Sequence, residues 1–476
     1  MSQNFPQTLQ IAHFALQAGY DALPGDVTRQ LKKHLLYAAG SLFASLRTPS
    51  VHRLAGQIRA FSEGGPCTVP LLGATAPDRA AQWYTALLGY SGSGDDFLAK
   101  GASCQPSDNA GALLAAAHLS GAGGRQFLTA LAVAYEVECR LATELPAPDR
   151  GYDDALYLAV SLTAALGRLL SLTPEQTAHA LGMAAASFNT LGISTASYTN
   201  EWEGLSASLV ALGCMNLVFL AKEGVTGPQQ VFEGPMGLKE LFGRELKYHW
   251  EKDHFELVGR CFLKKYGADV HLQSLVEAVL ALRGGLGTAV EEIDTIDVRT
   301  YLTAYHLAGG GDFGNRKEVF TPEQARFSIP YVLAVALIDG EAGPGQFLPE
   351  RINRPDVQGL LKKVTVHTAS LLHHPSKIAG LLDTFTESYP EALLGKVTIR
   401  FRNGREITEE KEDYPGFFTR PFSWEEVAGR FRNLSAPFLD SDHQQRIIDV
   451  IADLEHKEIR ELTGLLAAVP APEANR

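Results

Sequence analysis

The feature that most constrains the fold is a series of alanine- and leucine-rich segments that fills the chain up to about residue 260. Apolar residues recur there at helical spacing, and Gly, Pro and short polar clusters separate the segments. Thr173 followed by Pro174 and Glu175 marks a helix start, with Thr173 as the capping residue. The clearest predicted helices cover residues 112–119, 127–142, 156–172 and 174–186.

The pattern changes after about residue 262. Alternating residues predict strands over 293–300 and 364–368, and Asn403-Gly404 predicts a hairpin turn. Helical stretches over 272–282 and 326–338 interleave with these strands, and residues 424–465 return to amphipathic helix. The sequence therefore predicts a mainly α fold with two domains. Residues 1–262 and 410–476 form a large all-helical domain, and residues 263–409 form a smaller α+β lid domain.

Composition limits the binding partners and the cellular compartments that can be expected for this protein. The net charge of −12, with no Lys/Arg-rich run, disfavours nucleic acid and anionic membrane surfaces. The five cysteines are odd in number and form no C-x-x-C pair, so neither a disulfide framework nor a zinc site is expected. The N-terminus lacks the basic and apolar regions of a signal peptide, and no segment has the apolar length of a membrane span. We expect a cytoplasmic protein.

Standard catalytic signatures are absent, and three polar clusters remain. Residues 90–97 and 104–109 place paired carboxylates in a loop before a helix, where they form a pocket wall or, alternatively, serve as plain helix caps through Ser107 or Asp108. Residues 199–204 put two acids and a tryptophan at the start of a long apolar helix, which the helix dipole favours in any case. Residues 262–271 carry adjacent lysines at the domain junction, a place for a ligand cleft or merely a solvated face.

These clusters, in this order, resemble the MmgE/PrpD family, which includes 2-methylcitrate dehydratase, cis-aconitate decarboxylase and iminodisuccinate epimerase. The phrases RGYDDALYLAVSLTAALGRLL, FLAKEGVTGPQQVFEGPMGL and NRKEVFTPEQARFSIPY also carry the resemblance, which covers nearly the whole chain. It implies a large helical domain, a smaller α+β lid and an active site in the cleft between them. It also implies a homodimer that uses no metal and no organic cofactor.

The resemblance places the family's catalytic positions on this chain, and most are substituted. Lys264 matches a family lysine. The other positions hold Ser93 for an acidic residue, Phe97 for a threonine, Gln105 for a histidine, Glu203 for a lysine, Asp269 for a histidine and Phe313 for a tyrosine.

These substitutions remove acid/base groups and place two potential anions where two potential cations stood. Carboxylates at those positions repel a tricarboxylate, so we expect a neutral or cationic small-molecule substrate. The predicted catalytic residues are Asp95, Glu203, Lys264 and Asp269. The predicted substrate-binding residues are Tyr90, Ser93, Phe97, Gln105, Tyr198, Trp202, His271, Phe313 and Arg316, whose aromatic members supply stacking or cation–π contacts.

The resulting hypothesis is a cofactor-independent lyase or isomerase, repurposed for dehydration, a proton shift or cyclisation, with specialised metabolism as its setting. A carboxylic acid whose pKa is raised can replace histidine in such a step. One alternative is a conventional 2-methylcitrate dehydratase-like hydro-lyase or an iminodisuccinate-type epimerase. A second alternative is a non-catalytic homologue that binds a small molecule.

Overall fold

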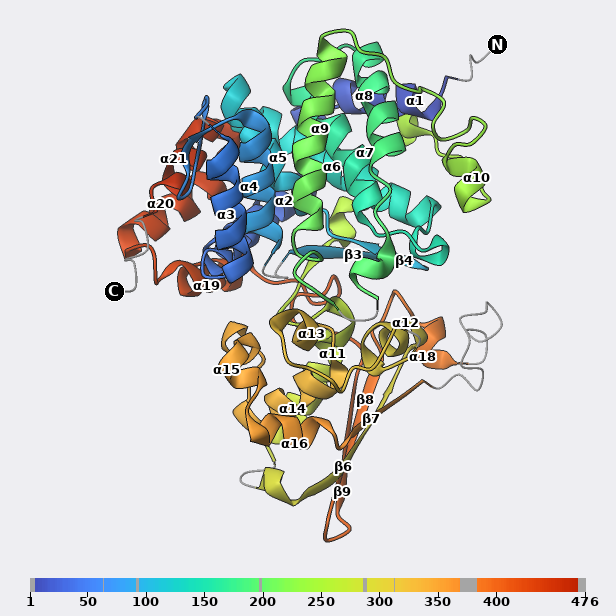
Figure 1. The fold of residues 1–476 in the computed structure, drawn as a ribbon, viewed down its shortest axis with the longest axis vertical. Coiled ribbons are helices and arrows are strands. Elements are labelled where there is room, and N and C mark those ends of the chain that lie inside the picture. Colours follow the sequence, from blue (N-terminus) through green and yellow to red (C-terminus); the bar gives the residue numbers. More distant parts are fainter. Residues whose placement is uncertain are drawn as a thin grey trace. The chain divides into compact units, whose positions relative to one another are not determined.

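The computed structural model describes residues 5–62, 64–90, 94–196, 199–285, 289–311, 313–368 and 383–469 (Figure 1). The chain divides into two compact units. The helical unit comprises residues 1–192, 204–263 and 422–476, and the mixed unit comprises residues 193–203 and 264–421. Compared with the predicted limits, the mixed unit extends from 409 to 421 and also takes in 193–203.

The helical unit is built from long helices around one apolar core. Its helices are α1 (Gln7–Gln17), α2 (Gly25–Ser45), α3 (Pro49–Phe61), α4 (Pro77–Gly89), α5 (Asp108–Ser120), α6 (Gly124–Glu144), α7 (Ala155–Leu169), α8 (Pro174–Ser187), α9 (Ser206–Lys222), α10 (Leu238–Phe242), α19 (Trp424–Ser435), α20 (Ser441–Ala452) and α21 (Ile459–Ala467). Small residues let neighbours approach closely. A Cβ on Gly111 of α5 would lie 2.3 Å from the backbone nitrogen of Thr85 in α4. Thr173 caps α8 as predicted, in a reciprocal pair of hydrogen bonds with Gln176.

Short strands interrupt this unit, where the sequence predicts almost only helix. β3 (Asp95–Ala99) pairs antiparallel with β4 (Ala102–Cys104) and with β5 (Phe262–Leu263). A separate hairpin joins β1 (Cys67–Val69) to β2 (Gly73–Thr75). The prediction missed these strands because they are two to five residues long, too short for an alternating pattern to stand out.

The mixed unit is built on a four-stranded sheet of order β7-β6-β8-β9. β6 (Ile293–Thr300) runs parallel to β7 (Val364–Thr368) and antiparallel to β8 (Gly395–Phe401), which pairs with β9 (Glu406–Lys411). The predicted Asn403-Gly404 turn joins β8 to β9, with Gly404 at φ 83°. α11 (Gln273–Arg283) packs on β8, β9 and α14 (Ile329–Asp339). The shorter helices are α12 (Leu302–Ala304), α13 (Pro322–Arg326), α15 (Pro349–Ile352), α16 (Pro355–Leu361) and α18 (Thr384–Glu387).

Both units agree with the predicted fold class, a mainly α chain with a smaller α+β portion, which is thereby confirmed. Among the helices of the described residues, none has the length and apolar character needed to cross a bilayer.

Candidate functional site

The first part of the candidate site lies in the mixed unit, directly after β5. Lys264 and Lys265 are adjacent but differ in environment. Lys264 is buried, whereas Lys265 reaches the surface and forms an ion pair with Glu277 at 2.7 Å. The description of the two lysines as a solvated face therefore fits Lys265 and not Lys264. Burying an ammonium group costs solvation free energy, which interactions with the surrounding protein must offset. The buried position of Lys264 therefore indicates a structural or functional role that a surface lysine does not have.

Asp269 and His271 follow in a single turn. The Asp269 carboxylate accepts a hydrogen bond from the His271 backbone N–H at 3.0 Å, which caps the short 3-10 helix η6 (Val270–Leu272). The Nδ1 atom of His271 lies 2.8 Å from the hydroxyl of Tyr301. Burial lowers the pKa of His271; nearby Asp269 opposes this shift and Lys264 adds to it. The imidazole is therefore held in its neutral form at neutral pH.

Arg316 completes this group from another part of the chain. Its Nε donates to the carbonyl of Leu307 at 2.8 Å, and one Nη donates to the carbonyl of Thr195 at 3.2 Å. Leu307 belongs to a π-helical turn, η8 (Tyr305–Gly309), a rare form that often marks functional sites. Burial lowers the pKa of Arg316, and the charge of Asp269 partly restores it. The fold thus brings together four predicted residues, which we call the mixed-unit cluster: Lys264, Asp269, His271 and Arg316.

The mixed-unit cluster combines a neutral base with two cations. His271 has Nδ1 engaged with Tyr301, while Nε2 has no hydrogen-bond partner among the described residues. A neutral imidazole under the influence of Lys264, with Arg316 linked to the same Asp269, suits proton abstraction from carbon, because cations stabilise the charge that then develops on an adjacent oxygen.

The second group of predicted residues lies in the helical unit around Asp95. Its carboxylate is fully buried and accepts a hydrogen bond from the Ser107 amide at 2.8 Å. Its other oxygen forms a short contact with Nδ1 of His34, from α2. Burial alone would raise the pKa of Asp95, but the charge and hydrogen bond of His34, with further hydrogen bonds from Tyr135 and Ser107, lower it overall. Asp95 is thus held as a carboxylate inside the core.

Two sequence interpretations of this region need correction. Asp95 and Asp96 do not lie in a loop, because they are the first two residues of β3. Ser107 stands at the N-cap position of α5, yet its hydroxyl makes no capping bond to that helix. It accepts instead from the Asp95 amide at 3.1 Å, so its role is to hold β3.

Glu138 of α6 is a further buried carboxyl, which was not predicted from the sequence. It accepts hydrogen bonds from Asn109 Nδ2 at 2.5 Å and from Ser161 Oγ at 3.0 Å. Burial, together with the charge of Asp108, raises the pKa of Glu138 to about 8. His34, Tyr135 and Tyr301 were missed as well. What the sequence offers for these three is the presence of a residue with a polar group on an otherwise buried helical face or strand end.

Comparisons with known proteins bear on the whole chain. The MmgE/PrpD N-terminal domain matches residues 9–251, and the MmgE/PrpD C-terminal domain matches residues 266–456. The chain belongs to the MmgE/PrpD family. It is 25% identical to the mouse cis-aconitate decarboxylase, over 70% of this chain and 66% of that protein. It is 23% identical to the Aspergillus terreus cis-aconitate decarboxylase, over 98% and 96%, and 24% identical to the Escherichia coli K12 2-methylcitrate dehydratase, over 76% of each.

These MmgE/PrpD relatives are lyases by name, which supports the predicted lyase class for this chain. The remaining predicted residues have varied environments. Tyr90 and Phe97 are buried in the core of the helical unit, and Gln105 makes a long 3.4 Å hydrogen bond to Asp96. Trp202 and Phe313 are exposed, and Glu203 is half-buried. Ser93 and Tyr198 lie outside the described residues.

The acids of the tryptophan motif also need a positional correction. Glu203 does not lie in the first turn of the apolar helix, because α9 begins only at Ser206 and its first turn contains no acidic residue. The motif forms a preceding turn, in which the Trp202 and Glu203 amides both donate to Asn200. The dipole of α9 therefore does not account for these acids.

One group of potential metal ligands occurs among the described residues, at Asp453, which precedes the 3-10 helix η10 (Leu454–His456), and at Glu455 and His456 within it. Each of these three side chains forms an ion pair within the protein. Asp453 contacts His456 at 2.6 Å, and Glu455 pairs with Lys32 of α2. Such pairing leaves these residues a structural role without a metal ion.

Proposed function

We propose that this MmgE/PrpD protein is a lyase or isomerase that moves a proton at a carbon next to a carbonyl or carboxyl group. The observation that carries the proposal is the mixed-unit cluster, in which a neutral His271 lies under the electrostatic influence of Lys264 and Asp269. The depressed pKa keeps the imidazole ready to accept a proton at neutral pH. The lyase names of the relatives support the same reaction class.

In the proposed step, Nε2 of His271 takes the proton from the substrate carbon. This requires that Nδ1–H donate to the Tyr301 hydroxyl, which fixes the tautomer. The electron pair of the broken C–H bond moves into the adjacent carbonyl, and Lys264 and Arg316 stabilise the negative oxygen. In a lyase that pair then expels a group from the next carbon. In an isomerase the proton returns at another carbon or face.

Within this scheme we assign Asp269 a positioning role. Its carboxylate holds the turn that carries His271, through the 3.0 Å bond to the His271 amide. Asp95 is assigned a similar role in the helical unit, because its oxygens are engaged by His34, Ser107 and Tyr135. Glu203 remains the predicted acid of the tryptophan motif.

The substrate we propose is a neutral or cationic small molecule, as the exchange of family cations for Glu203 and Asp269 favours. A second candidate, a conventional substrate with several carboxylates, is favoured by a different observation. Lys264 and Arg316 bring two cationic side chains to the mixed-unit cluster. Lysine and arginine are the side chains that bind carboxylates through charge-assisted hydrogen bonds.

A thermal-shift screen separates these substrates. Pools of polycarboxylates (citrate, 2-methylcitrate, cis-aconitate), neutral metabolites and amines are tested separately, because a ligand of the native state raises Tm. A shift with neutral or amine pools supports the first candidate, and a shift with polycarboxylates alone supports the second. Each hit is then incubated in D2O and followed by NMR. The proton step is supported if the unmodified protein exchanges a substrate C–H proton for deuterium, or eliminates a group from the substrate, and His271→Gln does neither. A ligand that binds but is not converted identifies a non-catalytic homologue.

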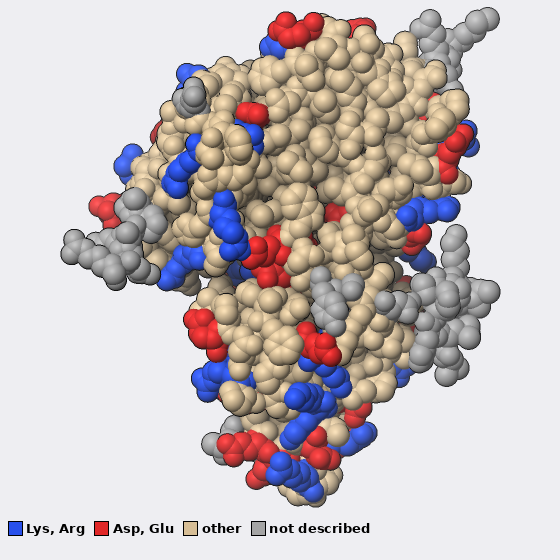
Figure 2. Space-filling view, viewed as in Figure 1, with Lys and Arg blue, Asp and Glu red and all other residues tan. Residues whose placement is uncertain are grey.

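We further propose that the chain forms a homodimer through α9. Figure 2 shows a broad face of the helical unit, over α9 and its neighbours α7 and α8, with scarcely any charged side chain. Leu209 and Leu220 on α9 are 43% and 46% exposed, and the exposed Asn216 lies between them, whereas Gly213 packs against the ring of Phe188. An uncharged face of this kind, lined by leucines, is typical of an interface with a second copy. The cytoplasmic location remains a prediction.

A further inference from the structure

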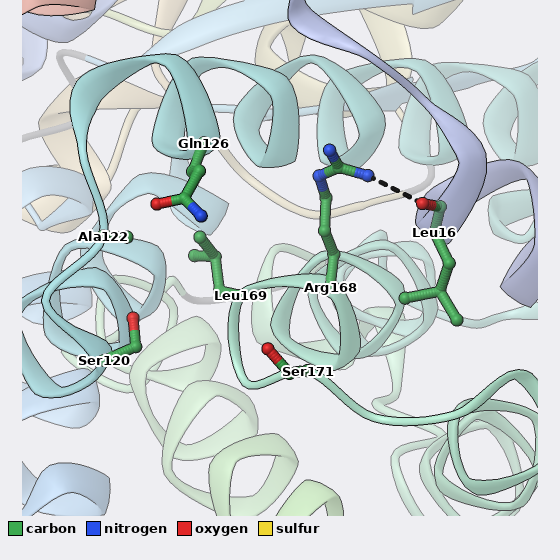
Figure 3. A pocket seen from close by; sticks show the side chains of 7 residues that line it. All are labelled: Leu16, Ser120, Ala122, Gln126, Arg168, Leu169 and Ser171. Atoms are coloured by element: carbon green, nitrogen blue, oxygen red, sulfur yellow. Dashed lines mark hydrogen bonds between the residues drawn. The ribbon is translucent and has the colours of Figure 1, made fainter.

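A pocket of about 270 Å³ lies in the helical unit, and none of the residues that line it belongs to the candidate site (Figure 3). It lies where the end of α5, the first turn of α6 and the end of α7 meet. Its polar side chains are Ser120, Gln126, Arg168 and Ser171. The volume is just below the range of about 300–1,000 Å³ typical of drug-sized ligands, so a smaller molecule fits.

Among the described residues that line the pocket, Arg168 is the one that carries a charge. One of its nitrogens, Nη1, donates to the carbonyls of Ala15 and Leu16 at 2.8 and 3.1 Å, at the end of α1. The described residues offer it no carboxylate, and burial is the sole cause that lowers the pKa of its guanidinium. The two carbonyls satisfy one nitrogen of the guanidinium, but among the described residues this half-buried arginine has no counter-anion.

The remaining donors of Arg168 have the geometry of an anion receptor. Nε and Nη2 form one edge of the planar guanidinium, the edge that binds carboxylate or phosphate through two parallel hydrogen bonds. Neither atom has a hydrogen-bond partner among the described residues. Figure 3 shows the nitrogen that faces Leu16 on one side of the guanidinium and the other two turned toward the Gln126 side.

The other polar groups add neutral donors. Gln126 uses its Oε1 to accept from the Gly123 amide at 3.0 Å, which leaves its Nε2 as a donor. Ser171 has its backbone in the left-handed region at φ 58°, and its hydroxyl makes no hydrogen bond with the described residues. We propose that this pocket binds a small oxyanion, a phosphate or a short carboxylate, with Arg168 as its charged anchor.

The test is isothermal titration of the full-length protein with inorganic phosphate, sulfate and acetate, each against a chloride background of equal ionic strength. We expect saturable binding of at least one oxyanion. Gln126→Glu should weaken it by about tenfold or more, because a carboxylate then faces the ligand while still offering the oxygen that caps Gly123. Arg168→Gln should abolish it.

Two further variants separate binding from folding. Ser171→Gly removes a hydroxyl but suits the left-handed backbone, so we expect weaker oxyanion binding together with an unchanged or higher Tm. Arg125→Gln removes an exposed arginine that neighbours Gln126 and contacts Asp21, and it should leave the affinity unchanged.

The proposal is overturned if none of the three anions binds, or if Gln126→Glu binds as tightly as the unmodified protein. It is also overturned if Lys264→Met abolishes the binding while Arg168→Gln leaves it intact, because the anion then occupies the mixed-unit cluster. Failure of the proposed lyase activity would not affect these outcomes, since no residue of the pocket belongs to the mixed-unit cluster.

Discussion

Asp95 and Ser107 exchange two hydrogen bonds. The Asp95 amide donates to Ser107 Oγ at 3.1 Å, and the Ser107 amide donates to Asp95 Oδ1 at 2.8 Å. The exchange ties the first residue of β3 to the first turn of α5. Because His34 of α2 holds the other oxygen, one carboxylate fixes three elements of the core.

Asp95→Asn should destabilise the helical unit strongly. The change leaves His34 without its charged partner in a fully buried position, where breaking such a pair costs about 3–5 kcal/mol. Urea unfolding followed by circular dichroism measures the loss. Asp149→Asn, in the exposed 3-10 helix η2 (Pro148–Arg150), gives the size of an ordinary surface change. A loss no larger than this control would contradict the network.

The same pair predicts a loss of stability in acid. Since the folded-state pKa of Asp95 lies below its ordinary value, the carboxylate stabilises the fold above the unfolded pKa of about 3.9. This contribution disappears as the pH falls through the folded-state pKa. The difference in unfolding free energy between the unmodified protein and Asp95→Asn should therefore be constant near neutrality and shrink below about pH 4.

Glu138 predicts the opposite pH dependence. Its pKa is raised to about 8, so the folded state keeps a proton that the unfolded state releases near pH 4.5. Between these values stability falls as pH rises, by at most about 1.4 kcal/mol per pH unit. Glu138→Gln, which keeps an oxygen for Asn109 and Ser161, should remove this slope. Melting curves from pH 5 to about 8.5 should show the variant gaining on the unmodified protein, and parallel curves would refute the shift.

Two helix glycines should respond to alanine with opposite sign. At Gly111 the new Cβ would lie 2.3 Å from the Thr85 nitrogen, so α4 and α5 must separate at a cost of about 1–3 kcal/mol or more. At Gly464 of α21 nothing lies within 4 Å, so alanine should stabilise by about 0.5–1 kcal/mol through its helix propensity. Tm should therefore be lower for Gly111→Ala and higher for Gly464→Ala than for the unmodified protein.

His271 predicts the acid limb of the pH profile. As its pKa is lowered, the base stays neutral below the ordinary histidine value of about 6.5, and kcat should fall only at lower pH. His271→Gln should reduce kcat by about 10²–10⁴-fold. His367→Gln, an exposed histidine of β7, should leave kcat unchanged. Full activity of His271→Gln would exclude it as the base.

Leu220→Asp should convert the proposed dimer to a monomer, because a carboxylate placed in an apolar interface loses its hydration without a partner. Light scattering coupled to size exclusion measures the mass. Leu348→Asp, at a leucine in the mixed unit that is 48% exposed, should leave it unchanged. A monomeric unmodified protein would contradict the interface.

The sequence predicted the long elements well because their signals are local. The capping pair at Thr173 and the turn at Gly404 depend on neighbouring residues alone, and both appear as expected. β3 was missed because, at five residues, it is too short for a clear alternating pattern, and its pairing with β5 joins residues more than 160 positions apart. Only the pairing with the three-residue β4 is local.

Less of the candidate site could be predicted from the sequence, because the burial and the contacts of its residues depend on segments that are far apart in the chain. Lys264 and Lys265 are indistinguishable by type, and only the fold shows that one is buried and the other paired with Glu277. The contact of His271 with Tyr301 likewise depends on how β6 ends beside η6. The sequence analysis placed His271 among the substrate-binding residues, whereas the family histidine fell on Asp269, and it gave no sign of Tyr301 as the partner of His271.

The hydrogen bonds of Asp95 have a consequence for how this family changes its chemistry. Asp95 is held inside the core by His34 and Ser107, whereas the one side-chain hydrogen bond of Gln105 to the described residues is the long bond to Asp96. The identity of residue 105 is thus separable from the framework that holds the strand. We expect an exchange at such a position to alter reactivity and leave the scaffold intact, so Gln105→His would introduce the histidine that the family resemblance places there without disturbing β3.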